Sequence, residues 1–231
     1  MKTVTVSAIA AFLVASTAAH AALITVAGDP ISGGQLSGST FNLATEGTNG
    51  DTNNFPNGER PSLAIDGDIN SKYLNFAQEF TGYVVLPAFG SSIVKGIEFV
   101  TANDSTVRDP ASYTLYGSNS LTVLPTSSFD LVANGFFQIS TGVLALPNTG
   151  TNITGDTSKS EGRGFSSSVG FANSTAYTSY ILVFPTIRDT GAANSMQIAE
   201  AVLSTIPEPT SALMLGIGAL GLAGFRRRKV A

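Results

Sequence analysis

The chain has 231 residues, of which 43% are hydrophobic and 12% charged, and its formal net charge is −4. Its only histidine is His20, and it contains no cysteine and no tryptophan. This composition excludes catalysis by Ser-His-Asp or Cys-His groups, zinc sites built on histidine or cysteine, and stabilisation by disulfides. Catalysis by carboxylates alone, as in glycosidases, is not excluded.

The N-terminus has the parts of a secretory signal peptide. Lys2 precedes an apolar stretch at 4–18, and small residues stand three and one positions before a cleavage point after Ala21. We therefore predict a signal helix at 1–21, which the exported protein loses together with His20. A buried N-terminal helix is the alternative, but the stretch has no amphipathic pattern.

Residues 22–205 are expected to form one domain. Short apolar segments, rich in β-branched and aromatic residues, alternate there with clusters of Gly, Asn, Ser, Thr and Pro. A spacing of about ten residues between such segments is typical of an all-β antiparallel sandwich. One helical turn is expected at 61–65 and a long loop at 148–168. The expected strands are 83–86, 93–101, 112–116, 129–132, 136–139, 180–184 and 196–203.

This span is acidic. Of the 16 acidic and 12 basic residues, Glu208, Lys2 and the four basic residues of 226–229 lie in the termini, so the remaining 15 acidic and 7 basic residues give a net charge of −8. Such a charge argues against a polyanionic partner, and we expect no nucleic-acid binding.

Six short motifs follow one another through the domain. They are AIDGD at 64–68, KYLNF at 72–76, TAND at 101–104, RDP at 108–110, YGSN at 116–119 and MQIAE at 196–200. In this order they resemble the discoidin-like (coagulation-factor C-type, galactose-binding-like) domain, over roughly residues 40–204. The resemblance implies an antiparallel jelly-roll sandwich and, since many such domains bind sugars, a binding role.

In that family a structural cation, usually calcium, lies where an early loop meets the last strand. The resemblance implies a carboxylate from Asp66, the hydroxyl of Ser71 in place of the usual threonine, and closure by Ala199 and Glu200. Main-chain carbonyls would come from Leu63 and Asp68.

The residues themselves agree with a hard cation, which binds six to eight oxygens from carboxylates, hydroxyls and carbonyls. Asp66 and Asp68 offer such oxygens in a tight turn around Gly67. An EF-hand is excluded, because Ser71 and Ala77 stand at its glycine and bidentate-glutamate positions. An Asp-Gly turn without a metal, in which Asp66 bonds its own backbone, stays open.

Other residues leave two interpretations open. Arg108 and Asp109 are expected to form a surface ion pair at a turn, and contact with a ligand is the alternative. Four aromatic residues are candidates either for sugar stacking or for the core, so no ligand site is assigned. They are Phe55, Tyr73, Phe76 and Tyr83.

The tail at 206–231 reads IPEPTSALMLGIGALGLAGFRRRKVA. A helix over the apolar run at 211–225 rises only about 22 Å, which is short of the ~30 Å hydrocarbon core of a bilayer. The basic cluster at 226–229 stays on the cytoplasmic side by the positive-inside rule. A short transmembrane helix that holds the protein transiently is therefore expected.

The order of Pro207-Glu208-Pro209, a short apolar helix and a terminal Arg cluster resembles the PEP-CTERM sorting signal of Gram-negative bacteria. The resemblance implies recognition by an exosortase at the inner membrane, cleavage near Pro207–Pro209 and release or transfer to the cell surface. Such bacteria usually also make exopolysaccharide.

The sequence thus predicts an exported, bacterial cell-surface or extracellular-matrix protein that is not an enzyme. We expect its discoidin-like sandwich to bind glycan or matrix polymer and to hold a structural calcium. The alternative is a purely structural protein of the exopolysaccharide layer. A carboxylate-based polysaccharide hydrolase is disfavoured, because nothing in a lone sandwich of this size indicates a catalytic cleft.

Overall fold

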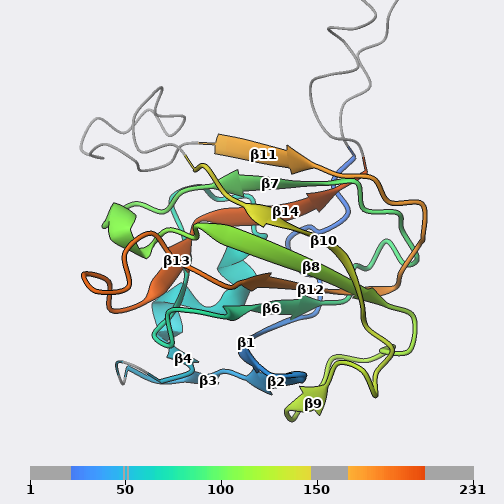
Figure 1. Cartoon of the computed structure of the whole chain (residues 1–231), viewed down its shortest axis with the longest axis horizontal. Coiled ribbons are helices and arrows are strands. Elements are labelled where there is room, and N and C mark those ends of the chain that lie inside the picture. Colours follow the sequence, from blue (N-terminus) through green and yellow to red (C-terminus); the bar gives the residue numbers. More distant parts are fainter. Residues whose placement is uncertain (1–21, 49, 51, 147–165, 206–231) are drawn as a thin grey trace, which may run out of the picture. The chain divides into compact units, whose positions relative to one another are not determined.

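The computed structural model describes residues 22–48, 50, 52–146 and 166–205. The expected signal segment, the expected sorting tail and most of the expected loop at 148–168 lie outside these residues. Almost all regular structure that is described consists of β-strands, with three short 3-10 turns (Figure 1). No helix among the described residues is long and apolar enough to cross a membrane.

The larger of the two main sheets has seven strands, and every neighbouring pair in it is antiparallel. In spatial order they are β10 (Phe137–Val143), β8 (Ser112–Ser118), β12 (Ser179–Phe184), β6 (Thr81–Val85), β1 (Ile31–Ser37), β2 (Thr40–Leu43) and β9 (Phe129–Asp130).

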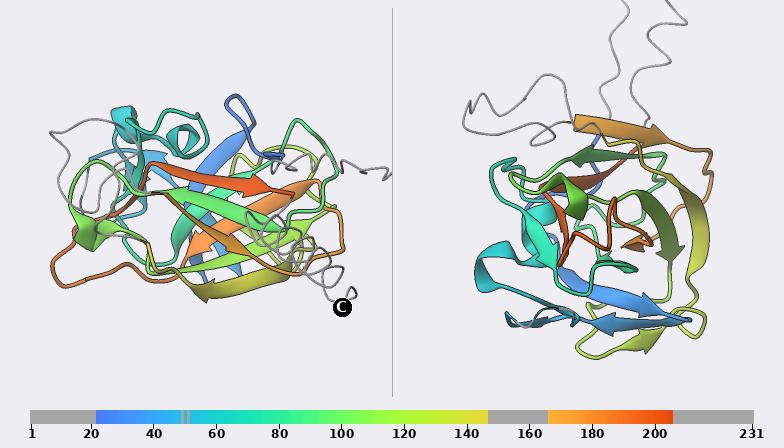
Figure 2. Two further views of the ribbon diagram at one scale, coloured as in Figure 1. Left: turned by 90° about the horizontal axis from the view of Figure 1, so that it is seen from above. Right: turned by 60° about the vertical axis from the view of Figure 1, so that its left-hand side comes forward.

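A three-stranded antiparallel sheet packs across the larger one (Figure 2). The chain passes from β6 in the large sheet to β7 in the small one and back to β8, as in a jelly roll. The predicted all-β antiparallel sandwich is therefore confirmed. The small sheet contains β11 (Ser166–Gly170), β7 (Gly96–Val100) and β14 (Glu200–Ser204). Two further strand pairs lie outside the two main sheets. The antiparallel pair is β13 (Met196–Ile198) with β5 (Tyr73–Asn75), and the parallel pair is β3 (Thr45–Glu46) with β4 (Asn54–Phe55).

The central strands β6 and β12 are buried on both faces. Alternate residues of β12, such as Tyr180 and Leu182, pack into the core between the sheets, whereas Ile181 and Val183 pack into a second cluster on the other face. The segment around Leu131 and Phe136 covers that second face. Burial on both faces explains why β12 is a continuous apolar run rather than an alternating one.

Sequence patterns missed β1, whose two glycines lower strand propensity, and its short neighbour β2. At Gly33 a Cβ atom would lie 2.4 Å from the hydroxyl of Tyr73, and at Gly34 it would lie 2.5 Å from the Asn42 carbonyl oxygen. Close packing thus requires glycine inside this strand. Two further predictions are wrong in part: 166–168 belongs to β11 rather than to a loop, and the strand expected at 196–203 is interrupted at Ala199.

The sandwich has two ends that differ in character. The loop end consists of η1 (Asn57–Glu59), η2 (Pro61–Ala64), the 65–72 turn, η3 (Thr106–Arg108) with the rest of 101–111, and the 186–199 segment that includes β13. The terminal end consists of 22–29, 86–95, 171–177 and 204–205. In the small sheet Glu200 pairs with Val100 toward the loop end and Ser204 pairs with Gly96 toward the terminal end.

Candidate functional site

The turn after η2 is held by the side chain of Asp66. The Asp68 amide donates to Asp66 Oδ1 at 2.8 Å, and the Ser71 hydroxyl donates to Asp66 Oδ2 at 2.9 Å. Gly67 adopts a φ of +79°, which glycine tolerates without steric cost. The local sequence therefore builds a compact loop with one carboxylate at its centre.

Glu200 reaches this loop from the first position of β14. The Gly67 amide donates to Glu200 Oε1 at 2.9 Å, and Glu200 is only 4% exposed. Ala199 interrupts the strand, and its amide donates to the Val100 carbonyl at 3.0 Å. Because β13 pairs with β5 and β14 pairs with β7, this break lets the chain change partners just before Glu200.

We call the loop at 65–72 the cation loop, after the cation site that the sequence predicts there. Its Asp66 carboxyl group and the carboxyl group of Glu200 are an unfavourable pair by themselves. Burial, followed by the nearby carboxyl group of Asp66, raises the pKa of Glu200 to about 8. Glu200 Oε2 is buried and accepts no hydrogen bond from the described residues, and the Asp66 carboxyl group lies beside the Glu200 carboxyl group. A bound cation would satisfy this oxygen and offset the repulsion, so the donor set fits a hard metal ion.

The structure thus brings together four of the six predicted ligands, Asp66, Asp68, Ser71 and Glu200. Leu63 lies in η2, which packs against β5 and β14, and its amide donates to the Arg60 carbonyl. The Asp68 carbonyl accepts hydrogen bonds from the Ser71 amide and hydroxyl. Within the described part of the chain no three Asp, Glu, His or Cys side chains cluster as metal ligands, so a cation here would also need hydroxyl and main-chain oxygens.

Next to the cation loop lies a buried lysine that the sequence analysis did not single out. Lys72 is 6% exposed, and its Nζ lies 2.9 Å from Asp104 Oδ1 and 3.2 Å from Glu59 Oε1. It also donates to Gln197 Oε1, while Gln197 Nε2 donates to the carbonyls of Asp104 and Ser105. This polar network ties η1, the 101–105 segment and β13 together, and no local pattern marks Lys72 as its centre.

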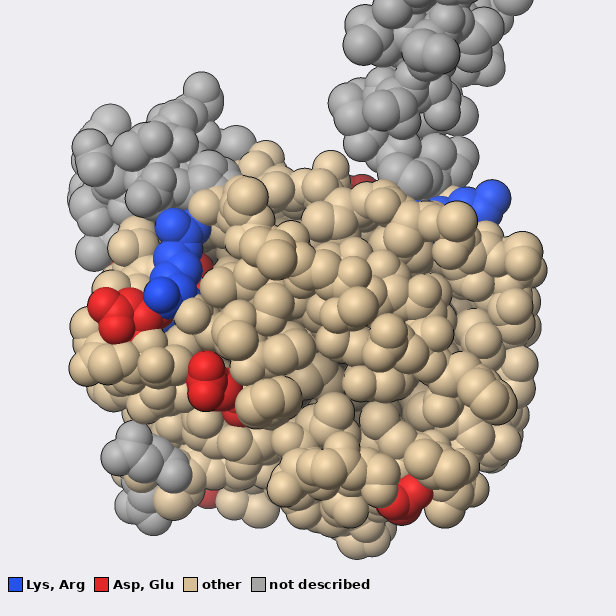
Figure 3. All heavy atoms as spheres, viewed as in Figure 1, with Lys and Arg blue, Asp and Glu red and all other residues tan. Residues whose placement is uncertain are grey.

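The expected Arg108–Asp109 ion pair is wrong. Arg108 instead pairs with Asp104, with 3.4 Å between NH1 and Oδ2, and Asp109 is fully buried with its Oδ2 3.6 Å from Arg188 Nε. Burial raises the pKa of Asp109 to about 8, although the Arg188 guanidinium acts in the opposite direction. Charged side chains near η3 gather on an otherwise largely uncharged face (Figure 3).

Two of the four aromatic candidates belong to the core. Tyr73 and Tyr83 have no exposed surface, and their hydroxyls donate to the carbonyls of Gly82 and Ala201. Phe55 and Phe76 are half-buried. The aromatic side chains that are exposed are others, namely Phe80, Phe89 and Phe137, and only the tertiary structure reveals their exposure.

Comparison with known proteins identifies the tail. Residues 205–229 match the PEP-CTERM protein-sorting motif, which confirms the resemblance seen in the sequence. No curated protein matches the chain.

Solved structures with a similar fold include several bacterial carbohydrate-binding modules. One is CpGH89CBM32-5 from Clostridium perfringens, in complex with GalNAc-β-1,3-galactose, at 15% identity over 79% of this chain and 99% of that chain, with a TM-score of 0.47. Another is the family 32 module of NanJ from C. perfringens in complex with galactose, at 13% identity over 80% and 99%, also with a TM-score of 0.47. A fucose-binding module of Streptococcus pneumoniae has 11% identity over 80% and 96%, with a TM-score of 0.45. At these identities and TM-scores the similarity identifies no ligand for this chain.

Proposed function

We propose that this chain is an exported, exosortase-processed surface or matrix protein whose β-sandwich binds glycan without catalysis. The observation that carries the export is the sorting-motif match at 205–229. An exosortase would cleave near Pro207–Pro209 and separate the domain from the basic cluster at 226–229. The partner at the membrane is therefore the exosortase, and the partner after release is a polysaccharide.

Mass spectrometry of the mature protein tests the processing. The chain is expressed in a Gram-negative host with an exosortase and in a matched strain without it. We expect the C-terminus to lie near Pro207–Pro209 only where the exosortase is present. Retention of 226–229 in both strains would show that the tail is a permanent anchor.

Partly exposed polar groups at the loop end support glycan binding there. The Asp104 and Arg108 side chains are 40% and 23% exposed and are held by their mutual ion pair. Sugar hydroxyls both donate and accept hydrogen bonds, and a carboxylate beside a guanidinium offers both complements. On a panel of acidic and neutral polysaccharides we expect Arg108→Ala to weaken retention, whereas Lys95→Ala at the terminal end should not. If the unaltered protein binds no polysaccharide, the alternative of a structural matrix protein holds.

We further propose that the cation loop holds a structural calcium. The support is the buried Glu200 oxygen that accepts no hydrogen bond from the described residues and the adjacent Asp66 carboxyl group. With free calcium at about 100 times its dissociation constant, binding adds about 2.7 kcal/mol of stability, so a chelator should lower the melting temperature by about 5–10 °C.

Two variants separate a bound cation from a simple turn. Asp66→Ala should abolish the chelator effect. Asp189→Ala removes a similar turn-forming carboxylate, which accepts from the Gly191 amide at 3.0 Å, and should leave the chelator effect intact. An identical melting curve with and without chelator in the unaltered protein would refute the calcium.

A further inference from the structure

The terminal end exposes large apolar side chains. Leu23 is 44% exposed, Val26 46%, Phe89 76% and Ile93 37%. Apolar side chains that are grouped on a surface, rather than scattered singly, mark a place where another surface binds.

Hydrogen bonds hold the segments that carry these side chains together. Asp29 is 5% exposed, and it accepts from the Val26 amide at 2.9 Å through Oδ2 and from the Ala88 amide at 2.8 Å through Oδ1. The segment with Val26 is thereby fixed beside the one that carries Phe89.

A second set of bonds fixes the rest of this end. Ser204 pairs with Leu23, and its carbonyl accepts from the Lys95 amide at 2.8 Å. Ser92 pairs with Tyr177, which keeps Ile93 in the same group of segments. The apolar side chains therefore belong to one ordered end of the sandwich.

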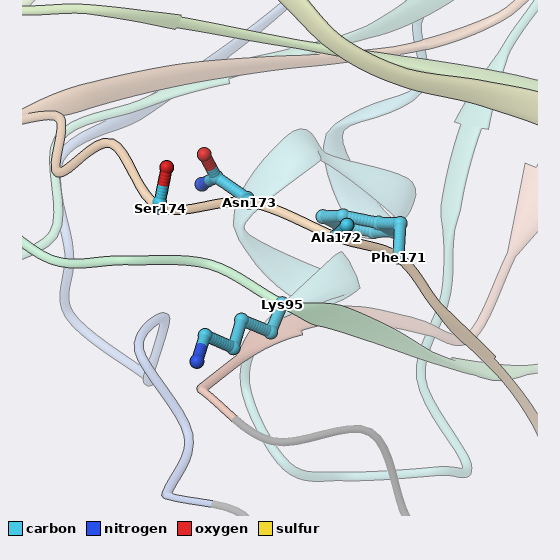
Figure 4. Close-up of a pocket in the computed structure, with 5 residues that line it drawn as sticks. All are labelled: Lys95, Phe171, Ala172, Asn173 and Ser174. Atoms are coloured by element: carbon cyan, nitrogen blue, oxygen red, sulfur yellow. The ribbon is translucent and has the colours of Figure 1, made fainter.

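Beside these side chains lies a shallow depression with one positive charge. It is lined by Lys95, Phe171, Ala172, Asn173 and Ser174. Figure 4 shows Lys95 across from the 171–174 segment, with its ammonium directed away from Phe171. A lysine with an apolar stem and a charged tip suits the boundary between acyl chains and anionic headgroups.

The short link between the domain and the apolar tail indicates that a membrane is what the terminal end binds. The Thr205 amide donates to the Ala22 carbonyl at 3.0 Å, so the last described residue is part of the terminal end. Only residues 206–210 separate it from the apolar run at 211–225, and six Cα–Cα steps span at most about 22 Å. Whenever that run is in a bilayer, the terminal end is held close to the lipid surface.

We propose that the terminal end docks on the membrane surface before processing, with Leu23, Val26, Phe89 and Ile93 against the lipid and Lys95 at the headgroups. This inference rests on the proposed export and tail anchoring. Docking would hold Pro207–Pro209 at the membrane surface and leave the loop end facing away.

The absence of cysteine permits a direct test. The chain without the predicted signal segment, residues 22–231, is reconstituted into vesicles of phosphatidylethanolamine and phosphatidylglycerol, with an environment-sensitive fluorophore on Phe89→Cys or Val26→Cys. Val143→Cys is the control, because Val143 is 82% exposed and lies far from the terminal end. Val143 pairs with Ser112 at the start of β8, whereas the other end of β8, at Ser118, lies beside Thr178 and so toward the terminal end. We expect a blue shift, and quenching by brominated lipid, at Phe89 and Val26 but not at Val143.

Each other outcome contradicts the inference in a distinguishable way. If the chain is in the vesicles but the Phe89 and Val26 labels stay in water, docking is refuted while tail anchoring stands. If the chain does not associate with vesicles at all, the proposed anchoring fails as well. A shift that depends on protein concentration and occurs without vesicles would assign this end to a second copy of the chain.

Discussion

The two ends of the sandwich differ in the kind of side chain that departs from the usual burial: ionisable groups are buried at one end, and apolar groups are exposed at the other. At the loop end, ionisable groups are buried: Lys72 is 6% exposed, Asp109 is fully buried and Glu200 is 4% exposed. At the terminal end, apolar groups such as Phe89 are exposed, and main-chain hydrogen bonds together with the buried side chain of Asp29 hold the segments. A buried ionisable group is tolerated only where its partners are fixed in place, so each of these positions at the loop end requires its particular residue and partner. An apolar surface needs no such partners.

The largest effect that separates the two ends should come from their lysines. Lys72→Met leaves Glu59 and Asp104 without their shared cation. Since both carboxylates keep some access to solvent, we expect a loss of about 2–3 kcal/mol in the free energy of unfolding, below the ~3–5 kcal/mol of a fully buried pair. Lys95→Met at the terminal end should change it by less than about 0.5 kcal/mol. Urea unfolding measures the free energy of unfolding of both variants. Equal losses would mean that the two lysines do not differ in their contribution to stability.

A smaller effect concerns pH. The pKa of Asp109 is raised to about 8 in the folded protein, against about 3.9 in an unfolded chain. Its protonated form therefore contributes stability that is fully present below about pH 4 and is lost as pH rises toward 8. Arg188, Lys72 and Asp104 are the charged groups that act on it, and the two cations lower its pKa.

Asp109→Asn should consequently flatten the decline of the melting temperature between about pH 4 and pH 8. Asp189→Asn is the matched control, because Asp189 is exposed on the same side of the sandwich, and it should keep the decline. Parallel pH profiles for Asp109→Asn and the unaltered protein would mean that Asp109 is ionised in the folded state.

The smallest effect on stability is expected at Phe89. Phe89→Ser removes a side chain that is 76% exposed, so the free energy of unfolding should change by less than about 0.5 kcal/mol. Thermal unfolding of the protein in solution, without vesicles, checks this. A loss of several kcal/mol would show that Phe89 belongs to the core, and the terminal end would then offer no apolar docking surface there.

The sequence by itself determined whatever depends on composition or on neighbouring residues. The lack of cysteine and of histidine beyond His20 removed whole classes of chemistry, and the apolar run of β12 and the turn chemistry of 66–68 needed only local information. The sorting tail is likewise one contiguous segment, so its match at 205–229 needs no knowledge of the fold.

The tertiary structure decided whatever depends on residues far apart in the chain. Glu200 meets the Asp66 loop only through the partner change at Ala199, and Asp109 pairs with Arg188 rather than with its neighbour Arg108. Phe89 lies in an exposed turn and Tyr83 in a strand that is buried on both faces, and the packing of the whole sandwich decides both. Sheet register and close packing fix these relations, and a local pattern of apolar and polar residues does not encode them.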